Sequence, residues 1–241
     1  FLLSLYKIEY MSDSLNNVKQ NVYQVNSDLQ NSHLVIQNFG NASSRFLEGF
    51  VIKPSGIILS ESNYKEMVQM DLNGNKIDGK MNPSSDEPTH RILYSEESEI
   101  NGIVHTHSKY ATAFAQANIE IPNLGTTHSD FSKYSIFVTE QLEESEVVDD
   151  YELNTGKKII DALKNRGISI LETPGILSIR HGVFSWGESI EEALKNAEII
   201  EYLAELCFIT KNLNPSSEII EDFISSKHFN RKHGPNKYYG Q

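Results

Sequence analysis

The sequence contains one cysteine, Cys207, in 241 residues. An internal disulfide is therefore impossible, and a single thiol fits a reducing compartment such as the cytoplasm. No apolar run approaches the roughly 20 residues that are needed to cross a bilayer. Basic residues are also scarce, with 21 against 33 acidic residues and a net charge of -12. This charge disfavours general binding to nucleic acid or to anionic membranes.

The remaining composition is that of an ordinary globular protein, with 39% hydrophobic and 22% charged residues. Apolar residues at helical spacing predict a first helix over residues 13–30. We expect residues 1–12 to be an extension outside the fold and residues 13–241 to form a single domain. Short strands are predicted over residues 35–36, 50–52 and 57–59, and a hairpin turn over residues 73–75.

Helices dominate the second half of the predicted structure. Serines and acidic residues at 84–87 open one helix, and Ser189 with Glu192 forms a capping box for another. One predicted helix begins at residue 84, and the others cover 109–117, 154–166, 190–210 and 217–226. One strand is predicted over 176–179. Because helices and strands alternate, we predict an α/β fold with one mixed sheet and helices on both faces.

The sequence around His105 and His107 carries the clearest chemical signal. An apolar run over residues 102–104 leads into His105 and predicts a buried strand. Residues i and i+2 of a strand point to the same face, so the two imidazoles should face one space. Such a pair is able to share a divalent metal. It is equally compatible with hydrogen-bonded polar residues at a strand end.

Two further residues are candidate metal ligands. His181 lies at the end of a predicted strand, and with His105 and His107 it would complete a three-histidine site that leaves positions open for substrate. On its own, a histidine at this place is typical of a structural residue. Asp86 lies in the first turn of a predicted helix, where an acid also complements the helix dipole.

Three short segments combine small residues with polar donors, a composition typical of backbone cradles for anions and of surface turns. The third segment opens a helix, whose N-terminal N–H groups attract phosphate. Lys53 would add a positive charge to the second. The candidates are Gly40 and Asn41 in the first segment, Lys53, Ser55 and Gly56 in the second, and Ser84 and Ser85 in the third.

Two more features point to proton transfer. Asp130 lies in a predicted loop over residues 126–130, either as a general acid or base or as a solvated carboxylate. The C-terminal segment is basic, contains His228 and Arg231, and ends in two tyrosines followed by Gly-Gln. It is either a disordered tail or a docked one, and a docked tail would bring Tyr239 near a metal.

These motifs resemble the class II aldolase family that contains L-ribulose-5-phosphate 4-epimerase. The resemblance runs from about residue 38 to residue 241. It is carried by GNAS (40–43), VIKPSG (51–56), PSSDEPTHR (83–91), GIVHTHS (102–108), GTTHSD (125–130), HGVFSWG (181–187), RKHG (231–234) and YYGQ (238–241).

The resemblance implies a three-layer α/β/α sandwich around a largely antiparallel sheet, and homotetramers with active sites between neighbouring subunits. Asp130 and Tyr239 would be the acid/base pair, with Tyr239 from the adjacent subunit. The cofactor would be Zn²⁺, with Mn²⁺ or Co²⁺ as alternatives. The metal ligands would be Asp86, His105, His107 and His181. The substrate would be held by Gly40, Asn41, Lys53, Ser55, Gly56, Ser84, Ser85, His228 and Arg231.

The implied reaction interconverts L-ribulose 5-phosphate and D-xylulose 5-phosphate, in arabinose or ascorbate catabolism. Because the C4 hydrogen is not acidic, the family cleaves the C3–C4 bond by a retro-aldol step and re-forms it, with the metal as Lewis acid. One alternative is a sugar-phosphate aldolase of the same family, which carries Glu at the position of Asp86 and lacks the Tyr-Tyr-Gly-Gln ending. The other is a non-catalytic structural homologue without the metal site.

Overall fold

The computed structural model describes residues 2–235 and 237–238, with side chains of α1 from Ser14 onward. Its centre is a seven-stranded sheet in the order β4-β3-β2-β1-β5-β7-β6, in which every pair of neighbouring strands is antiparallel. The strands are β1 (Asn41–Phe46), β2 (Gly49–Ile52), β3 (Val68–Asp71), β4 (Lys76–Asp78), β5 (Gly102–Thr106), β6 (Gly175–Ser178) and β7 (Gly182–Gly187).

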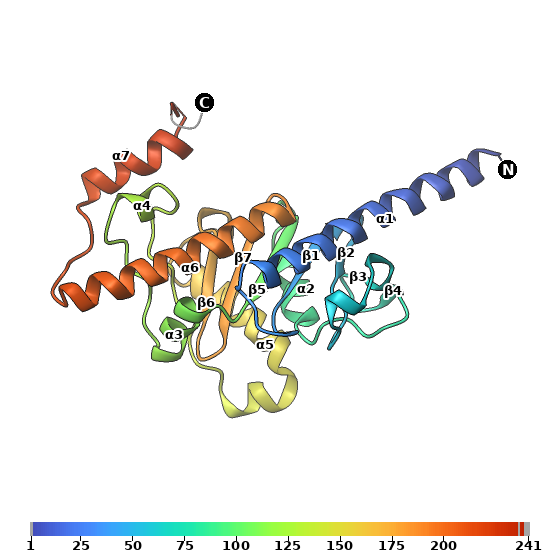
Figure 1. Ribbon diagram of the computed structural model, residues 1–241, viewed down its shortest axis with the longest axis horizontal. Coiled ribbons are helices and arrows are strands. Elements are labelled where there is room, and N and C mark those ends of the chain that lie inside the picture. The colour runs from blue at the N-terminus through green and yellow to red at the C-terminus, as the bar shows by residue number, and fades with distance from the viewer. Residues whose placement is uncertain (1, 236, 239–241) are drawn as a thin grey trace.

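Helices cover both faces of this sheet (Figure 1). On one face α2 and α5 enclose one apolar core, and on the other α1, α3 and α6 enclose two more. The predicted three-layer α/β/α sandwich is thereby confirmed. The helices are α1 (Leu2–Asn31), α2 (Glu87–Glu96), α3 (Lys109–Ala117), α4 (Thr126–Ser129), α5 (Glu144–Lys164), α6 (Ile190–Leu213) and α7 (Asp222–His233), with 3-10 turns at Leu59–Glu61, Tyr64–Glu66 and Ile170–Glu172.

Strand alternation decides which core each residue enters. In β5, Ile103 packs in the core under α2 and α5, and Val104 packs in the core under α1 and α6. His105 shares the face of Ile103 because side chains alternate with a period of two. The histidine is therefore directed toward the layer that contains α2 and α5.

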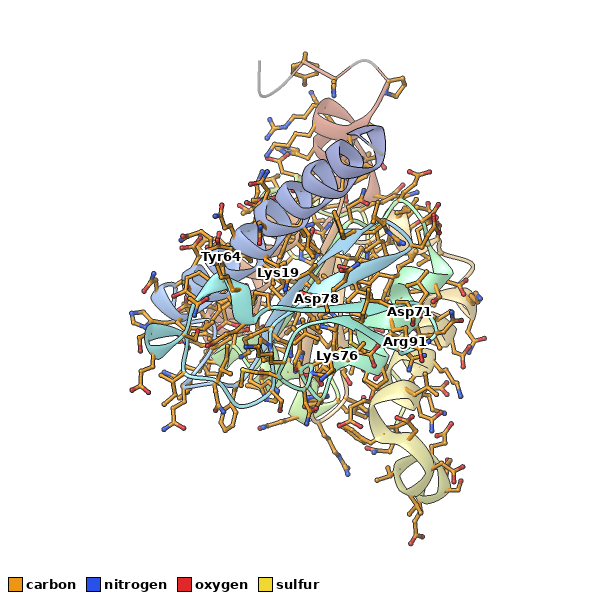
Figure 2. All side chains as sticks on the ribbon, turned by 90° about the vertical axis from the view of Figure 1, so that its right-hand side faces the viewer. Lys19, Tyr64, Asp71, Lys76, Asp78 and Arg91 are labelled. Carbon is orange, nitrogen blue, oxygen red and sulfur yellow. The ribbon has the colours of Figure 1, made fainter. Side chains whose placement is uncertain are left out.

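One edge of the sheet is held by polar contacts. Lys19 of α1 forms an ion pair with Asp78 of the edge strand β4 (Figure 2). The β3–β4 turn has Gly74 at a φ of +86°, and the carboxylate of Asp71 accepts the backbone N–H groups of Asn73 and Asn75. This contact confirms the hairpin turn that was predicted over residues 73–75.

Several predicted boundaries are wrong. The first helix begins at Leu2 rather than at residue 13, and Figure 1 shows its N-terminal half projecting beyond the sheet. The helix predicted from residue 154 begins at Glu144 and contains a kink at Asp150. The last helix covers Asp222–His233 instead of residues 217–226, and the loop predicted over 126–130 contains the short helix α4.

Two predicted strands are absent from the described residues, and four observed strands were not predicted. Residues 35–36 lie between two turns, which contain His33 and Gln37 at positive φ, and they form no strand. Residues 57–59 lead into a 3-10 turn. Strand β1 was not predicted because its sequence, NASSRF, has few apolar residues. Strands β3 and β4, on either side of the predicted turn, and strand β7 were also not predicted.

We expect Gly102→Ala to destabilise the protein, because β5 touches the start of α6 at this residue. An added Cβ would lie 2.3 Å from the Cα of Ile190 and 2.4 Å from its backbone nitrogen. Overpacking of this kind costs about 1–3 kcal/mol of unfolding free energy or more. Chemical denaturation measures the loss. Gly125→Ala is the control, because no atom lies within 4 Å of its added Cβ; equal losses in both variants would contradict the expectation.

Candidate metal centre

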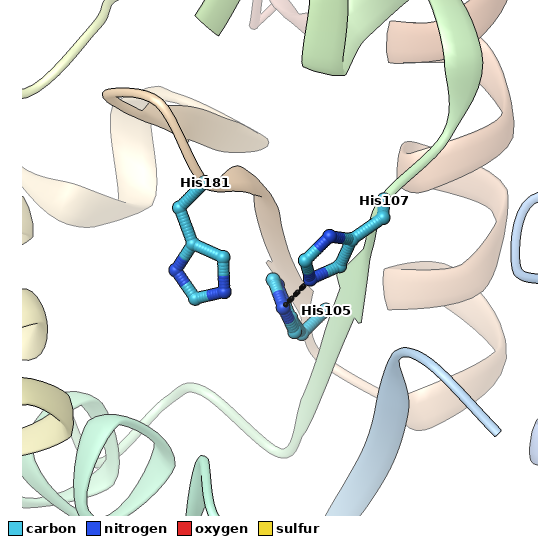
Figure 3. Close-up of side chains that lie close together, drawn as sticks. All are labelled: His105, His107 and His181. Atoms are coloured by element: carbon cyan, nitrogen blue, oxygen red, sulfur yellow. Dashed lines mark hydrogen bonds between the residues drawn. The ribbon is translucent and has the colours of Figure 1, made fainter. Parts of the chain in front are cut away.

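Three histidines from two parts of the chain meet at one end of β5 (Figure 3). His105 lies on β5, His107 follows the strand, and His181 lies in the turn between β6 and β7. One ring nitrogen of each histidine lies within 4.8 Å of those of the other two. The Nε2 atoms of His105 and His107 are 3.0 Å apart. The prediction that these imidazoles face one space is confirmed.

His105 is held on its far side by the neighbouring strand β7. Its Nδ1 atom lies 2.9 Å from the carbonyl oxygen of Val183, to which an Nδ1–H donates. Its ring stacks on Phe184 at 4.2 Å between centroids. Donation through Nδ1 leaves the lone pair on Nε2, the atom that faces the other histidines.

His181 is presented by a tight turn. The preceding residue, Arg180, has a φ of +56°, and its backbone N–H donates to the carbonyl of Ala115 at 3.0 Å. A left-handed conformation at a residue other than glycine costs energy and persists only where the surroundings hold it. The turn orients the imidazole of His181 so that its ring centroid lies 4.7 Å from that of His105.

Asp86 lies beside the three histidines, at the N-cap of α2. Its Oδ2 atom is 3.9 Å from Nε2 of His105 and accepts a 2.6 Å hydrogen bond from the side-chain amide of Asn41. The carboxylate does not cap its own helix. It is instead directed toward the histidines, which a purely structural N-cap would not require.

Burial keeps these imidazoles uncharged. Desolvation lowers the pKa of His105 to about 3 and that of His181 to about 3, and it also lowers the pKa of His107. A neutral imidazole is the form that binds a metal, so the site needs no deprotonation at neutral pH.

The donor set fits a divalent metal. Metal–nitrogen bonds of about 2.0–2.1 Å would place tetrahedral nitrogen ligands roughly 3.3 Å apart, close to the 3.0 Å between the two Nε2 atoms. Among the described residues, Nδ1 of His181 and Oδ1 of Asn41 are buried without a hydrogen-bond partner. Buried polar atoms without partners are costly. A bound ion with its ligands would account for the unpaired oxygen of Asn41, whereas Nδ1 of His181 lies on the side of its ring away from the other two histidines (Figure 3).

The predicted anion cradles lie near the centre but are partly occupied. The ammonium of Lys53 is buried, and it donates to the carbonyls of Asn38 and Gly40 at 2.9 and 2.7 Å. Burial lowers its pKa to about 8. The backbone N–H of Ser84 donates to the carbonyl of Lys53, so it is not free for a phosphate as the sequence implied. The backbone N–H of Ser55 is also used, while Ser55, Gly56 and Ser85 are exposed.

Asp130 has different neighbours. It caps the C-terminus of α4, and its carboxylate accepts hydrogen bonds from His228 at 3.0 Å and from Arg231 at 3.0 and 2.6 Å. Burial alone would raise the pKa of Asp130, but the hydrogen bonds from Arg231 and His228 outweigh it and lower the pKa. Its partners come from α7, and Figure 1 shows α4 and α7 together at one end of the molecule.

Tyr239, the predicted partner of Asp130, lies outside the described residues. Two aromatic residues near the histidines were not singled out from the sequence. Tyr151, the residue after the kink in α5, lies 5.8 Å from His181, and the exposed Phe39 lies 6.0 Å from His107, between ring centroids. No spacing rule connects these residues to the histidines, so the sequence held no signal for them.

The fold and the histidine cluster define a class of protein. Residues 20–208 match the class II aldolase and adducin N-terminal domain. The chain therefore belongs to this family.

The chain is also similar to individual proteins of this family and to solved structures. The chain is 44% identical over 229 residues to "L-ribulose-5-phosphate 4-epimerase UlaF" from Salmonella paratyphi B. The matched region covers 94% of this chain and all of the relative. A protein of the same description from Salmonella typhi matches equally. Among solved structures, an L-fuculose 1-phosphate aldolase superposes with a TM-score of 0.74 at 24% identity, covering 88% of this chain and 94% of the other. This likeness shows the shared fold.

Acid should destabilise the metal-free protein, because the pKa of His105 and of His181 is about 3 when folded and about 6.5 when unfolded. Between these values the unfolded chain binds more protons, so stability is lost as pH falls. We expect the thermal midpoint of chelator-treated protein to drop steadily from about pH 7 to about pH 4. His105→Gln, which does not titrate here, should show a shallower slope; equal slopes would contradict this account.

Proposed function

We propose that this protein is a metal-dependent L-ribulose-5-phosphate 4-epimerase, which interconverts L-ribulose 5-phosphate and D-xylulose 5-phosphate. The observation that supports it most is the cluster of His105, His107, His181 and Asp86 in a chain that is 44% identical to proteins named for this activity. The pathway would be arabinose or ascorbate catabolism in the cytoplasm. Within the described residues, no helix is long and apolar enough to span a membrane.

The three histidines and Asp86 would hold the metal, which we propose to be Zn²⁺, with Mn²⁺ or Co²⁺ as alternatives. When bound, the ion supplies Lewis-acid stabilisation of the charge that develops on substrate oxygens as the C3–C4 bond breaks. The side chain of Asn41 orients the carboxylate of Asp86. Gly40, Asn41, Lys53, Ser55, Gly56, Ser84 and Ser85 would line the substrate and phosphate positions.

We propose that Asp130 and Tyr239 transfer the protons. The ion pairs with Arg231 and Lys232 and the hydrogen bond from His228 keep Asp130 ionised, which is the form that accepts a proton from a hydroxyl group. None of His105, His107 and His181 is among its hydrogen-bond partners. We therefore propose that the active site forms between neighbouring subunits of a homotetramer, with His228, Arg231 and the C-terminal tail lining it. Residues 13–241 would form the domain, with residues 1–12 outside it.

A sugar-phosphate aldolase is the second candidate, because the same fold carries an L-fuculose 1-phosphate aldolase. Against it, Asp86 stands where such aldolases carry Glu, and the chain ends in Tyr-Tyr-Gly-Gln. A non-catalytic homologue would not need buried neutral histidines with an adjacent carboxylate. Release of glycolaldehyde phosphate without formation of D-xylulose 5-phosphate would establish the aldolase instead.

Removal of the metal should abolish epimerisation. We expect chelator-treated protein to be inactive on L-ribulose 5-phosphate, activity to return with Zn²⁺, and His107→Ala to remain inactive because one ligand is lost. Metal content and formation of D-xylulose 5-phosphate are the measurements. His33→Asn is the control, because His33 is exposed at a φ of 60° that asparagine tolerates. Full activity in metal-free protein would refute the proposal.

Asp130→Asn should lower the turnover number by roughly 10²–10⁴-fold, because the amide cannot accept the proton. Zn²⁺ should still bind, since Asp130 contacts α7 rather than the histidines. Steady-state kinetics and metal analysis of the same preparation separate the two effects. Asp149→Asn, at an exposed carboxylate, is the matched control. Unchanged turnover in Asp130→Asn would show that another residue is the general base.

A further inference from the structure

Strand β1 and helix α2 are joined by polar contacts at three levels. Asn41 donates to Asp86 at 2.6 Å, and Ser43 Oγ lies 2.7 Å from Nδ1 of His90. Arg45 donates to the backbone carbonyls of Tyr94 and Glu97 at 2.9 and 2.7 Å. The start, the middle and the end of α2 are thus each attached to β1.

The spacing of these contacts is regular in both elements. Asn41, Ser43 and Arg45 are two residues apart on one face of a strand, a step of about 6.6 Å. Asp86, His90 and Tyr94 are four residues apart on one face of a helix, a step of about 6 Å. Because the two steps nearly match, successive residues on this face of the strand contact successive turns of the helix. We call this set of six residues the β1–α2 ladder.

The middle of the ladder is buried. Ser43 and His90 are fully buried, and Tyr94 is 1% exposed. Ser43 Oγ also lies 2.9 Å from the hydroxyl of Tyr94. Within the described residues Nε2 of His90 has no hydrogen-bond partner. The ring of His90 is therefore attached by its Nδ1 atom to Ser43.

Apolar side chains would fill the same space without the cost of burying polar groups. The polar ladder adds a fixed register, because hydrogen bonds require particular distances and directions. That register matters at the metal centre. Strand β1 pairs with β5 so that Asn41 lies opposite His105. Fixing α2 on β1 therefore fixes Asp86 relative to the histidines.

We propose that His90, held by Ser43, is a positioning residue of the metal centre that keeps Asp86 within reach of the ion. This inference rests on the proposed metal site. His90 sits one helical turn after Asp86, and its backbone N–H donates to the Asp86 carbonyl at 3.1 Å. Its ring meets the edge of Phe184 at 6.1 Å, and Phe184 stacks on His105. His90 is thus linked to Asp86 through the helix backbone and to His105 through the ring of Phe184.

The test compares two buried serines. Ser43→Ala removes the hydroxyl that holds His90. Ser185→Ala is the matched control, because Ser185 is fully buried on β7 and its hydroxyl donates to Ala193 of α6, at 2.8 Å. For both full-length variants we would measure the affinity for Co²⁺, the absorption spectrum of the Co²⁺ protein, which reports the ligand set, and the thermal midpoint without metal.

We expect Ser43→Ala to bind Co²⁺ roughly 10–100-fold more weakly, as is typical for loss of an outer-shell partner, and to show an altered spectrum. Ser185→Ala should lower the thermal midpoint while keeping the affinity and spectrum of the unchanged protein. If Ser43→Ala also binds like the unchanged protein, or if both variants weaken binding equally, His90 has no positioning role. If the unchanged protein itself binds no Co²⁺, the proposed metal centre fails, and this inference fails with it.

A second pair of variants covers the case in which Ser43→Ala does not fold. His90→Asn keeps a polar group near the position of Nδ1, and His90→Leu does not. We expect His90→Asn to restore most of the Co²⁺ affinity that His90→Leu loses. Equal affinity in the two variants would overturn the inference, because the hydrogen bond to Ser43 would then have no effect on the metal.

Discussion

The antiparallel pairing of β5 with both β1 and β7 is the constraint on which the candidate metal centre depends. Pairing with β7 brings the turn that carries His181 to the end of β5, where His105 and His107 lie. Pairing with β1 sets Asn41 opposite His105, and Asn41 in turn holds Asp86. One strand register therefore brings together proposed ligands that are separated by up to 95 residues, from Asp86 to His181.

The cost of burying polar groups explains how the centre is built. Each imidazole or carboxylate that leaves water needs a partner. Val183 provides one for His105, Asn41 for Asp86 and Ser43 for His90. These partners also orient the groups, so the same contacts that limit the energetic cost of burial prepare the site for a metal. Asp130 follows the same logic at another place, where three basic residues of α7 surround it.

Much of the fold was predictable because local patterns agree with the tertiary structure. The helix over Lys109–Ala117 was predicted at its observed bounds, and strand β6 was predicted within one residue. Ser189 does cap α6, where it accepts the N–H of Glu192; the Glu192 side chain, however, accepts from Glu188 instead of completing the box. Prediction failed for β1, because its polar residues face α2 and only packing shows that they are buried.

By itself, the sequence determined that His105 and His107 share one face, because a strand has a side-chain period of two. It also determined an α/β chain without disulfides, and its motifs indicated the family. Only the tertiary structure decided that His181 and Asp86 join that face, because strand pairing and helix packing connect residues that no local period relates. It also decided that Asp130 contacts His228 and Arg231 rather than the three clustered histidines at the end of β5 and in the β6–β7 turn, because α7 packs against α4.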